Sequence, residues 1–168
     1  IFKDYQTIRE QAGRIQKLTG VSRSHGCSYA ESWNRVQFQR MPNVSLQPNP
    51  RAVTLDDLIG GVDDGLYIVG DKSWSIDMQR YNFQFTGQVF YRIHHGRIVG
   101  QVKDAAYQSK TTDFWNAMDE VGGPSTYVLG GAFNCGKGQS GQVAPVSHGC
   151  PAARFRGITI LNTVAEGH

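Results

Sequence analysis

Residues 82–93, NFQFTGQVFYRI, carry the strongest strand signal in the chain and decide its fold class. Five large apolar residues share one parity: Phe83, Phe85, Val89, Tyr91 and Ile93. The polar residues Gln84, Gln88 and Arg92 take the other parity. Because successive side chains of a strand point to opposite faces, one face of this segment can be buried while the other meets solvent.

The segments around this stretch extend the pattern into an antiparallel meander. Strand character is found in residues 36–46, 66–69, 73–81, 97–102 and 154–163. The first of these is expected to form two short strands or one bulged edge strand, because Pro42 cannot donate to a central ladder. The tripeptide His94-His95-Gly96 predicts a hairpin turn, with glycine at the position that needs a positive φ.

Three segments are predicted to be helical. Residues 3–18 place apolar side chains at spacings of three and four, which is one helical stripe. Residues 54–59 begin with an N-cap threonine and have an acidic residue three positions on, which is a capping box before a short helix. Residues 112–121 are expected to form a helix that is capped by Thr111 or Thr112 and stopped by Gly-Gly-Pro.

Strand signals outnumber helix signals, so the sequence predicts an α+β fold. We expect a mostly antiparallel β-sheet, either a sandwich or open and barrel-like, with two or three peripheral helices. A chain of 168 residues can form a single domain, residues 1–168, and bury roughly 70% of its unfolded surface. Two stretches rich in small and polar residues, 21–34 and 130–141, are expected to be loops, and Cys135 lies in the second.

Composition and termini restrict the setting. Three cysteines cannot all pair, and no signal-peptide pattern opens the chain, so we expect reducing, cytoplasmic surroundings. No apolar stretch approaches the roughly 20 residues that cross a bilayer, so we expect no membrane contact. A net charge of +3, without a basic block, gives no support to direct nucleic acid binding. Because the chain starts at Ile1 and ends with Gly167-His168, which resemble a tag stub, we expect an expressed fragment of a longer protein.

The tetrapeptide SHGC occurs twice and raises the question of a shared metal site. Its possible ligands are His25, Cys27, His148 and Cys150. Zinc fingers usually place two to four residues between paired ligands, whereas here only one glycine intervenes. We therefore favour two polar loops with unligated thiols. No HExxH, HExxxH, CxxC or GxSxG motif occurs in the chain, nor does a Walker phosphate loop.

Cys135 has different sequence neighbours from the other two cysteines. Nearby glycines let the backbone approach a ligand closely, and Lys137 favours the thiolate, which is the form that binds metal or attacks. The residues alone leave two interpretations open. Cys135 is either a metal ligand or nucleophile, or an unreactive loop thiol.

Three strings of residues, in this order along the chain, point to a known family. They are residues 38–48 (FQRMPNVSLQP), residues 64–68 (DGLYI), and residues 134–149, which begin NCGKGQ and end PVSHG. Together they resemble the C-terminal half of TldD proteins, of the TldD/PmbA family once called modulators of DNA gyrase. The resemblance covers about residues 15–162. It implies a zinc-dependent peptidase for unfolded or small peptides, working as a homodimer or with a TldE/PmbA-like partner subunit.

The resemblance also implies roles for particular residues. In the family, a preceding half carries HExxxH, whose histidines bind zinc and whose glutamate is the general base, and the cysteine of the CGK string is the third ligand. Carried onto this chain, that zinc ligand is Cys135, and neither Cys27 nor Cys150 inherits a metal role. The implied substrate-binding residues are Gly136, Lys137, Gln139 and His148.

The chain departs from the family pattern in one respect, because it holds no HExxxH. With one ligand of three and no general base, we expect this chain alone neither to bind zinc tightly nor to cleave peptides. Two alternatives remain. One is a non-catalytic TldE/PmbA-like partner or scaffold subunit, against which the presence of Cys135 argues. The other is a DNA gyrase modulator, which the mild charge does not favour.

Overall fold

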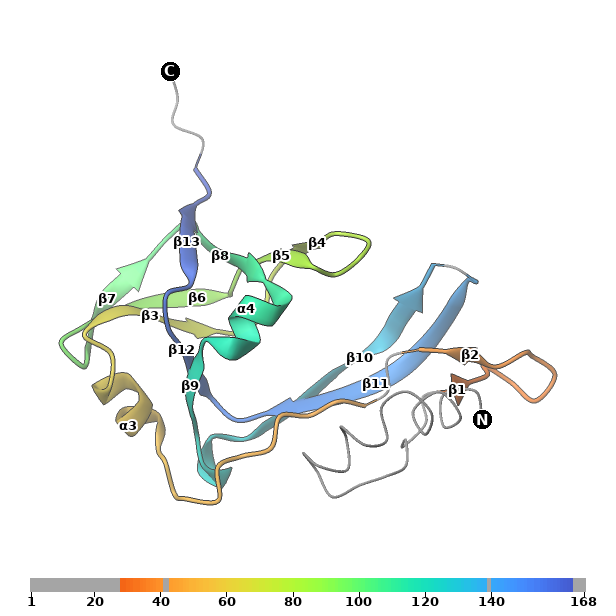
Figure 1. The fold of residues 1–168 in the computed structure, drawn as a ribbon, viewed down its shortest axis with the longest axis horizontal. Helices are drawn as coiled ribbons and strands as arrows, with labels where there is room; N and C mark the ends of the chain where they lie inside the picture. The colour runs from red at the N-terminus through yellow and green to blue at the C-terminus, as the bar shows by residue number, and fades with distance from the viewer. Residues whose placement is uncertain (1–27, 41–42, 139, 165–168) are drawn as a thin grey trace. The chain divides into compact units, whose positions relative to one another are not determined.

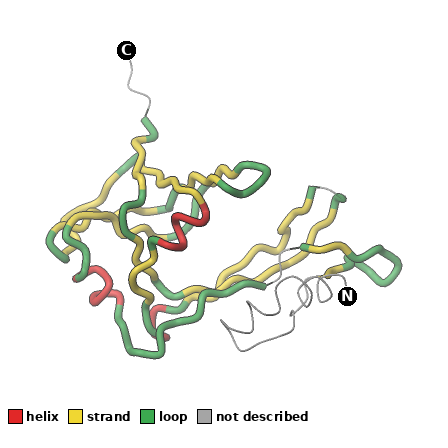
Figure 2. The backbone as a smooth tube through the Cα atoms, in the orientation of Figure 1, coloured by secondary structure: helices red, strands yellow, loops and turns green. Residues whose placement is uncertain are grey.

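A computed structural model of the chain describes residues 28–40, 43–138 and 140–164. Figure 2 shows many strands joined by loops and only short helices. All strand pairs of known register are antiparallel. The predicted α+β class, with mostly antiparallel sheets, is therefore confirmed. None of the described helices is long and apolar enough to span a bilayer.

Some predictions fall outside the described residues. They concern the helix over residues 3–18, the residues His25, Cys27 and Gln139, and the suspected tag stub Gly167-His168.

The chain divides into two compact units, each made of two separate stretches of sequence. The first unit is Ile1–Ser45 with Leu129–Gly149, and the second is Leu46–Val128 with Cys150–His168. The expectation that residues 1–168 behave as one domain stays a prediction.

The second unit contains three sheets, which Figure 1 labels. The three-stranded sheet has the order β3-β6-β7, from β3 (Asp64–Val69), β6 (Val89–His94) and β7 (Arg97–Val102). The four-stranded sheet has the order β13-β8-β5-β4, from β13 (Thr159–Asn162), β8 (Ala105–Lys110), β5 (Asn82–Phe85) and β4 (Trp74–Ile76). The third sheet pairs β12 (Ala153–Phe155) with β9 (Met118–Val121).

Residues 82–93 form two strands in different sheets rather than one continuous strand. β5 belongs to the four-stranded sheet and β6 to the three-stranded sheet. The chain crosses between them at Gly87, where an added Cβ would lie 2.5 Å from the Ile68 side chain. Beyond this crossing both faces of β6 are covered, since Phe90 is 5% and Ile93 is 2% exposed. The prediction that only one face of this segment is buried is therefore wrong for β6.

The turn between β6 and β7 confirms the hairpin prediction. Both His95 (φ 47°) and Gly96 (φ 73°) adopt positive φ, as a two-residue hairpin turn of the primed type requires. An added Cβ at Gly96 would lie 2.9 Å from the Gly60 carbonyl oxygen, so this position needs glycine for space as well as for its backbone conformation.

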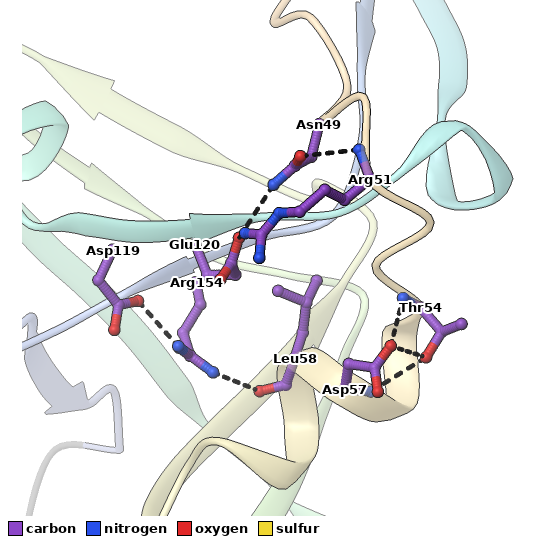
Figure 3. Close-up of polar contacts among 8 residues, drawn as sticks. All are labelled: Asn49, Arg51, Thr54, Asp57, Leu58, Asp119, Glu120 and Arg154. Atoms are coloured by element: carbon purple, nitrogen blue, oxygen red, sulfur yellow. Dashed lines mark hydrogen bonds and ion pairs between the residues drawn. The ribbon is translucent and has the colours of Figure 1, made fainter.

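Helix α3 (Leu55–Gly60) confirms the predicted capping box. The Thr54 hydroxyl accepts a hydrogen bond from the Asp57 amide (3.1 Å), and the Asp57 carboxylate accepts one from the Thr54 amide (2.8 Å), as Figure 3 shows. The helix buries Leu58 and Ile59.

The predicted helix over residues 112–121 is wrong in its second half and in its cap. Helix α4 spans only Thr111–Asn116, and its N-cap is Lys110, which makes no side-chain capping bond. The following residues form β9, which pairs with β12 from the other end of the sequence. This long-range pairing satisfies the backbone groups of residues 118–121, so it overrides their local preference for helix. The 3₁₀ turn η2 (Pro124–Thr126) follows.

The described part of the first unit contains two two-stranded sheets. β1 (Ser28–Tyr29) pairs with β2 (Phe38–Gln39), and β10 (Val128–Lys137) pairs with β11 (Gln142–Cys150). The expected irregular loop over residues 130–141 is therefore wrong, because Cys135 lies on a ten-residue strand. An added Cβ at Gly131 would lie 2.3 Å from the Val146 carbonyl oxygen. Gly131 thus serves close contact between β10 and β11 rather than a loop.

A polar cluster ties α3 to the β9–β12 sheet of the second unit (Figure 3). Arg154 donates from Nε to the Asp119 carboxylate (2.9 Å) and from Nη1 to the Leu58 carbonyl (3.2 Å). Arg156 donates to the other Asp119 oxygen. The hydrogen bond from Arg154 holds the pKa of Asp119 below its usual range, although partial burial opposes this shift.

The lowered pKa of Asp119 predicts a loss of stability in acid. Because the folded-state pKa is depressed, the contribution of Asp119 is complete above the unfolded value of about 3.9 and is lost as pH falls through the folded value. We expect Asp119→Asn to lower the free energy of unfolding by about 1–3 kcal/mol at neutral pH. Urea denaturation at pH 7 and pH 3 measures this.

The matched control is Asp56→Asn, on an exposed residue of α3. Its effect should stay within about 0.5 kcal/mol at both pH values. The difference between wild type and Asp119→Asn should shrink at pH 3. A difference of constant size across this range would contradict the role of the Asp119 charge.

Candidate metal-ligand site

Two hydrogen bonds connect the part of β10 around Cys135 to Gln39, the last residue of β2, and to Arg40, which follows it. Arg40 donates from Nη2 to the Cys135 carbonyl oxygen (2.7 Å), and Lys137 donates from Nζ to the Gln39 carbonyl oxygen (2.9 Å). Cys135 and Lys137 are two residues apart on one strand and therefore share a face. The first bond holds the main chain of Cys135, and the second holds the side chain of Lys137 against Gln39.

Arg40 is a buried cation that sequence reasoning missed. It is 8% exposed, and its buried Nε and Nη1 atoms have no hydrogen-bond partner among the described residues. A guanidinium stays charged in proteins, so Arg40 places a permanent positive charge beside the main chain of Cys135. Arg40 lies in the string FQRMPNVSLQP, but its only local signal is a basic residue directly after a short apolar-polar alternation. Its contact to Cys135 spans 95 residues of sequence.

His148 lies on β11 and is engaged by its own chain. Its Nδ1 lies 3.0 Å from the carbonyl oxygen and 3.2 Å from the amide nitrogen of Val44. On either side, the Ser147 amide donates to Asn43 Oδ1 (2.9 Å) and the Gly149 amide donates to Ser45 Oγ (3.0 Å). Residues 43–45 therefore run along this part of β11. A substrate-binding role for His148 stays a prediction.

The other predicted substrate-binding residues, Gly136, Lys137 and Gln139, differ in whether neighbouring residues already contact them. An added Cβ at Gly136 would meet no atom within 4 Å, so the backbone there is open to a ligand. The ammonium group of Lys137 already donates a hydrogen bond to the Gln39 carbonyl oxygen. Gln139 lies outside the described residues.

The thiol of Cys135 is chemically suited to be one ligand of a metal ion. The residue is half-buried, so its sulfur is not sealed in the core, and thiolate sulfur is a preferred zinc donor. No group of three or more His, Cys, Asp or Glu side chains that could hold a metal ion occurs in residues 28–40, 43–138 and 140–164. A metal ion with three or more such ligands would therefore need at least one ligand from outside these residues.

Cys150, the other cysteine that the structure describes, is an exposed residue at the end of β11. Cys135 lies on β10 near the connection to β11, whereas Cys150 is the last residue of β11 and lies at the far end from this connection. Of the two SHGC tetrapeptides, the structure describes the second, which contains His148 and Cys150. The expected polar loop is wrong for this tetrapeptide, because residues 147–150 belong to β11. That the thiols are unligated stays a prediction.

Comparison with protein families gives a match over nearly the whole chain. Residues 3–162 match the family described as PmbA/TldA metallopeptidase C-terminal domain.

Individual relatives carry related names. The chain is 34% identical, over 124 residues, to a protein named metalloprotease from Methanothermobacter thermautotrophicus, and the match covers 74% of this chain and 26% of that protein. It is 30% identical, over 148 residues, to a metalloprotease TldD homolog from Buchnera aphidicola (subsp. Acyrthosiphon pisum), covering 88% of this chain and 29% of that protein. The chain thus spans between a quarter and a third of the length of these relatives.

Among solved structures, the chain is similar to TldE from Thermococcus kodakarensis. The TM-score is 0.54 at 16% sequence identity, over 86% of this chain and 29% of the other. At this identity the similarity concerns the fold alone.

Proposed function

The chain belongs to the PmbA/TldD family, as the C-terminal domain of its metalloprotease-like proteins, and from this we propose that Cys135 is the thiolate ligand of a catalytic zinc ion. The peptidase would be the longer polypeptide of which this chain is the C-terminal part, and its substrates would be unfolded or small peptides. The remaining ligands and the general base would come from an HExxxH helix in the preceding part.

The observation that carries this proposal is the fixed, half-buried thiol of Cys135. Its carbonyl oxygen accepts a hydrogen bond from Arg40, and Lys137 of the same strand donates to Gln39, so the main chain that carries the thiol is tied to neighbouring residues. Metal ligands need such positioning, because a ligand that moves weakens the site. When bound, zinc supplies a Lewis acid that polarises an amide carbonyl and acidifies a water molecule. The contribution of this chain is to hold one donor in place.

The peptide would lie along β10. Among the described residues, β10 has a single strand neighbour, β11, so its second edge has backbone groups left for pairing. An extended peptide added to such an edge is held by main-chain hydrogen bonds, which tolerate many side chains. Gly136, where the backbone is open, would permit close approach near the metal. Broad peptide specificity follows from this mode of binding.

Removing the metal tests the proposal. We expect the full-length protein to hydrolyse unstructured fluorogenic peptides, to lose this activity with a zinc chelator, and to regain it when zinc is added back. Magnesium at the same concentration is the control, because it prefers oxygen ligands over a thiolate and should not restore activity. Hydrolysis that is unaffected by the chelator would count against a zinc peptidase.

The assembly would include a second subunit, either a copy of the same protein or a TldE/PmbA-like partner. Apolar side chains are exposed along β10, with Leu129 68% and Phe133 94% exposed, and such side chains are usually covered in an assembly. Light scattering on the full-length protein distinguishes a monomer from a dimer. A non-catalytic, TldE-like role is the alternative, and it predicts a full-length protein without stoichiometric zinc.

A further inference from the structure

A large cavity lies in the second unit between the inner faces of two sheets. Its volume is about 590 Å³. Its lining includes the aromatic residues Tyr107, Phe114 and Phe155 and the aliphatic residues Leu66 and Ile68 of β3. Phe114 and Phe155 stack on each other with ring centroids 4.0 Å apart.

This cavity has the size and lining of a small-molecule site. Protein interiors are close-packed, and voids larger than a few water molecules are uncommon. Pockets for small ligands usually enclose about 300–1,000 Å³, with mostly apolar walls and a few polar groups that fix orientation. A ligand that buries an apolar side chain against Phe114 and Phe155 would replace water on an apolar surface.

The polar groups of the cavity form one ion pair. Arg92 Nη2 lies 2.5 Å from Asp64 Oδ1, and the two side chains are 45% and 55% exposed, so the pair stands where the cavity meets solvent. The pair leaves hydrogen-bonding capacity unused. A guanidinium has five N–H donors and a carboxylate has two acceptor oxygens, and this contact occupies one donor and one oxygen.

We propose that this cavity binds a free α-amino acid with an aromatic or large aliphatic side chain. The side chain would lie against Tyr107, Phe114 and Phe155. The α-carboxylate would accept hydrogen bonds from Arg92, and the α-ammonium would donate to the free oxygen of Asp64. A zwitterion matches this arrangement because its two charges sit on one carbon, opposite a cation and an anion that are themselves in contact. A peptide terminus offers only one of the two charges.

The cavity and the candidate metal ligand belong to different units of the chain. All its lining residues belong to the second unit, whereas Cys135 belongs to the first. Free amino acids are also the end products of extensive peptide hydrolysis, so the biological meaning of the site rests on the proposed function. Binding itself does not, because it needs no metal and no turnover. The two proposals can therefore fail independently.

Calorimetric titration of the metal-free chain with three probes tests the proposal. The probes are L-phenylalanine, phenylacetate, which lacks the ammonium group, and phenethylamine, which lacks the carboxylate. We expect saturable binding of L-phenylalanine, about tenfold tighter than that of either analogue, because each charged hydrogen-bonded group contributes roughly that factor. No saturable binding, or phenylacetate that binds as tightly as L-phenylalanine, would overturn the assignment.

Two variants locate the charges. Arg92→Gln should weaken L-phenylalanine and phenylacetate about tenfold and leave phenethylamine unchanged, whereas Asp64→Asn should weaken L-phenylalanine and phenethylamine and leave phenylacetate unchanged. The half-exposed pair contributes little to folding, so both variants should remain folded. The control is Arg97→Gln, which makes the same change on exposed β7 and should alter nothing. Equal effects of all three variants would overturn the proposal, as would loss of binding in the full-length protein.

Discussion

Replacing Cys135 by serine in the full-length protein should remove its bound zinc and lower its peptidase activity by at least about a hundredfold. The reason is the loss of a thiolate, which is a much stronger zinc donor than a neutral hydroxyl. Changes to the groups that merely orient a zinc ligand cost about 10–100-fold, so loss of the ligand itself should cost at least as much. Zinc content by elemental analysis and the rate of peptide hydrolysis measure the two effects.

The matched control for this variant is Cys150→Ser. Both residues are cysteines of the β10–β11 pair, but Cys150 is exposed at the end of β11. We expect Cys150→Ser to keep full zinc content and activity within about twofold of wild type, as surface substitutions usually do. If Cys150→Ser lost zinc and Cys135→Ser kept it, the ligand assignment would be wrong.

Replacing Gly131 by alanine should destabilise the first unit by about 2–3 kcal/mol. The added Cβ would lie 2.3 Å from the Val146 carbonyl oxygen and 3.0 Å from the Cα of Ser147. Both atoms are main chain, so no side chain can rotate away, and β10 and β11 would have to separate. Denaturant unfolding gives the loss of free energy, and hydrogen exchange along residues 128–150 locates it.

Gly136→Ala is the control for this substitution on the same strand. An added Cβ there meets no atom within 4 Å, so its effect should stay within about 1 kcal/mol. The two variants make one chemical change at two positions of β10. Equal destabilisation by both would show that glycine flexibility, not the close contact to β11, explains the requirement at Gly131.

The parts of the fold that sequence predicted correctly depend on local chemistry. The capping box of Thr54 and Asp57 involves residues three apart, and the hairpin at His95-Gly96 depends on the conformational freedom of its two turn residues. Both have a signal that lies within a few residues of sequence, although Gly96 also lies against the Gly60 carbonyl oxygen. Such features can be read from a short window of sequence.

The errors lie where distant partners decide the structure. Residues 118–121 form a strand because β12 supplies their hydrogen bonds from more than thirty residues away, as the pairing of Val121 with Ala153 illustrates. The glycine-rich sequence around Cys135 resembles a loop, yet it forms strand β10, and Gly131 permits close contact with β11. Local propensity cannot reveal either partner, because each lies outside the window that the pattern covers.

The candidate site divides in the same way. Nearby glycines and Lys137 singled out Cys135 in the sequence, and family resemblance gave it a role. Its contacts were not predictable, because Arg40 and Gln39 lie 95 and 98 residues from their partners. The buried charge of Arg40 in particular depends on how β10 meets the segment after β2. No local sequence pattern predicts this contact between Arg40 and β10.

X-ray absorption at the zinc edge of the full-length protein tests the ligand assignment most directly. The account predicts one sulfur scatterer at about 2.3 Å together with nitrogen or oxygen scatterers at about 2.0 Å. In Cys135→Ser reconstituted with excess zinc, the sulfur shell should be absent. A wild-type spectrum without sulfur, or a sulfur shell that persists in Cys135→Ser, would contradict the claim that this domain supplies the thiolate.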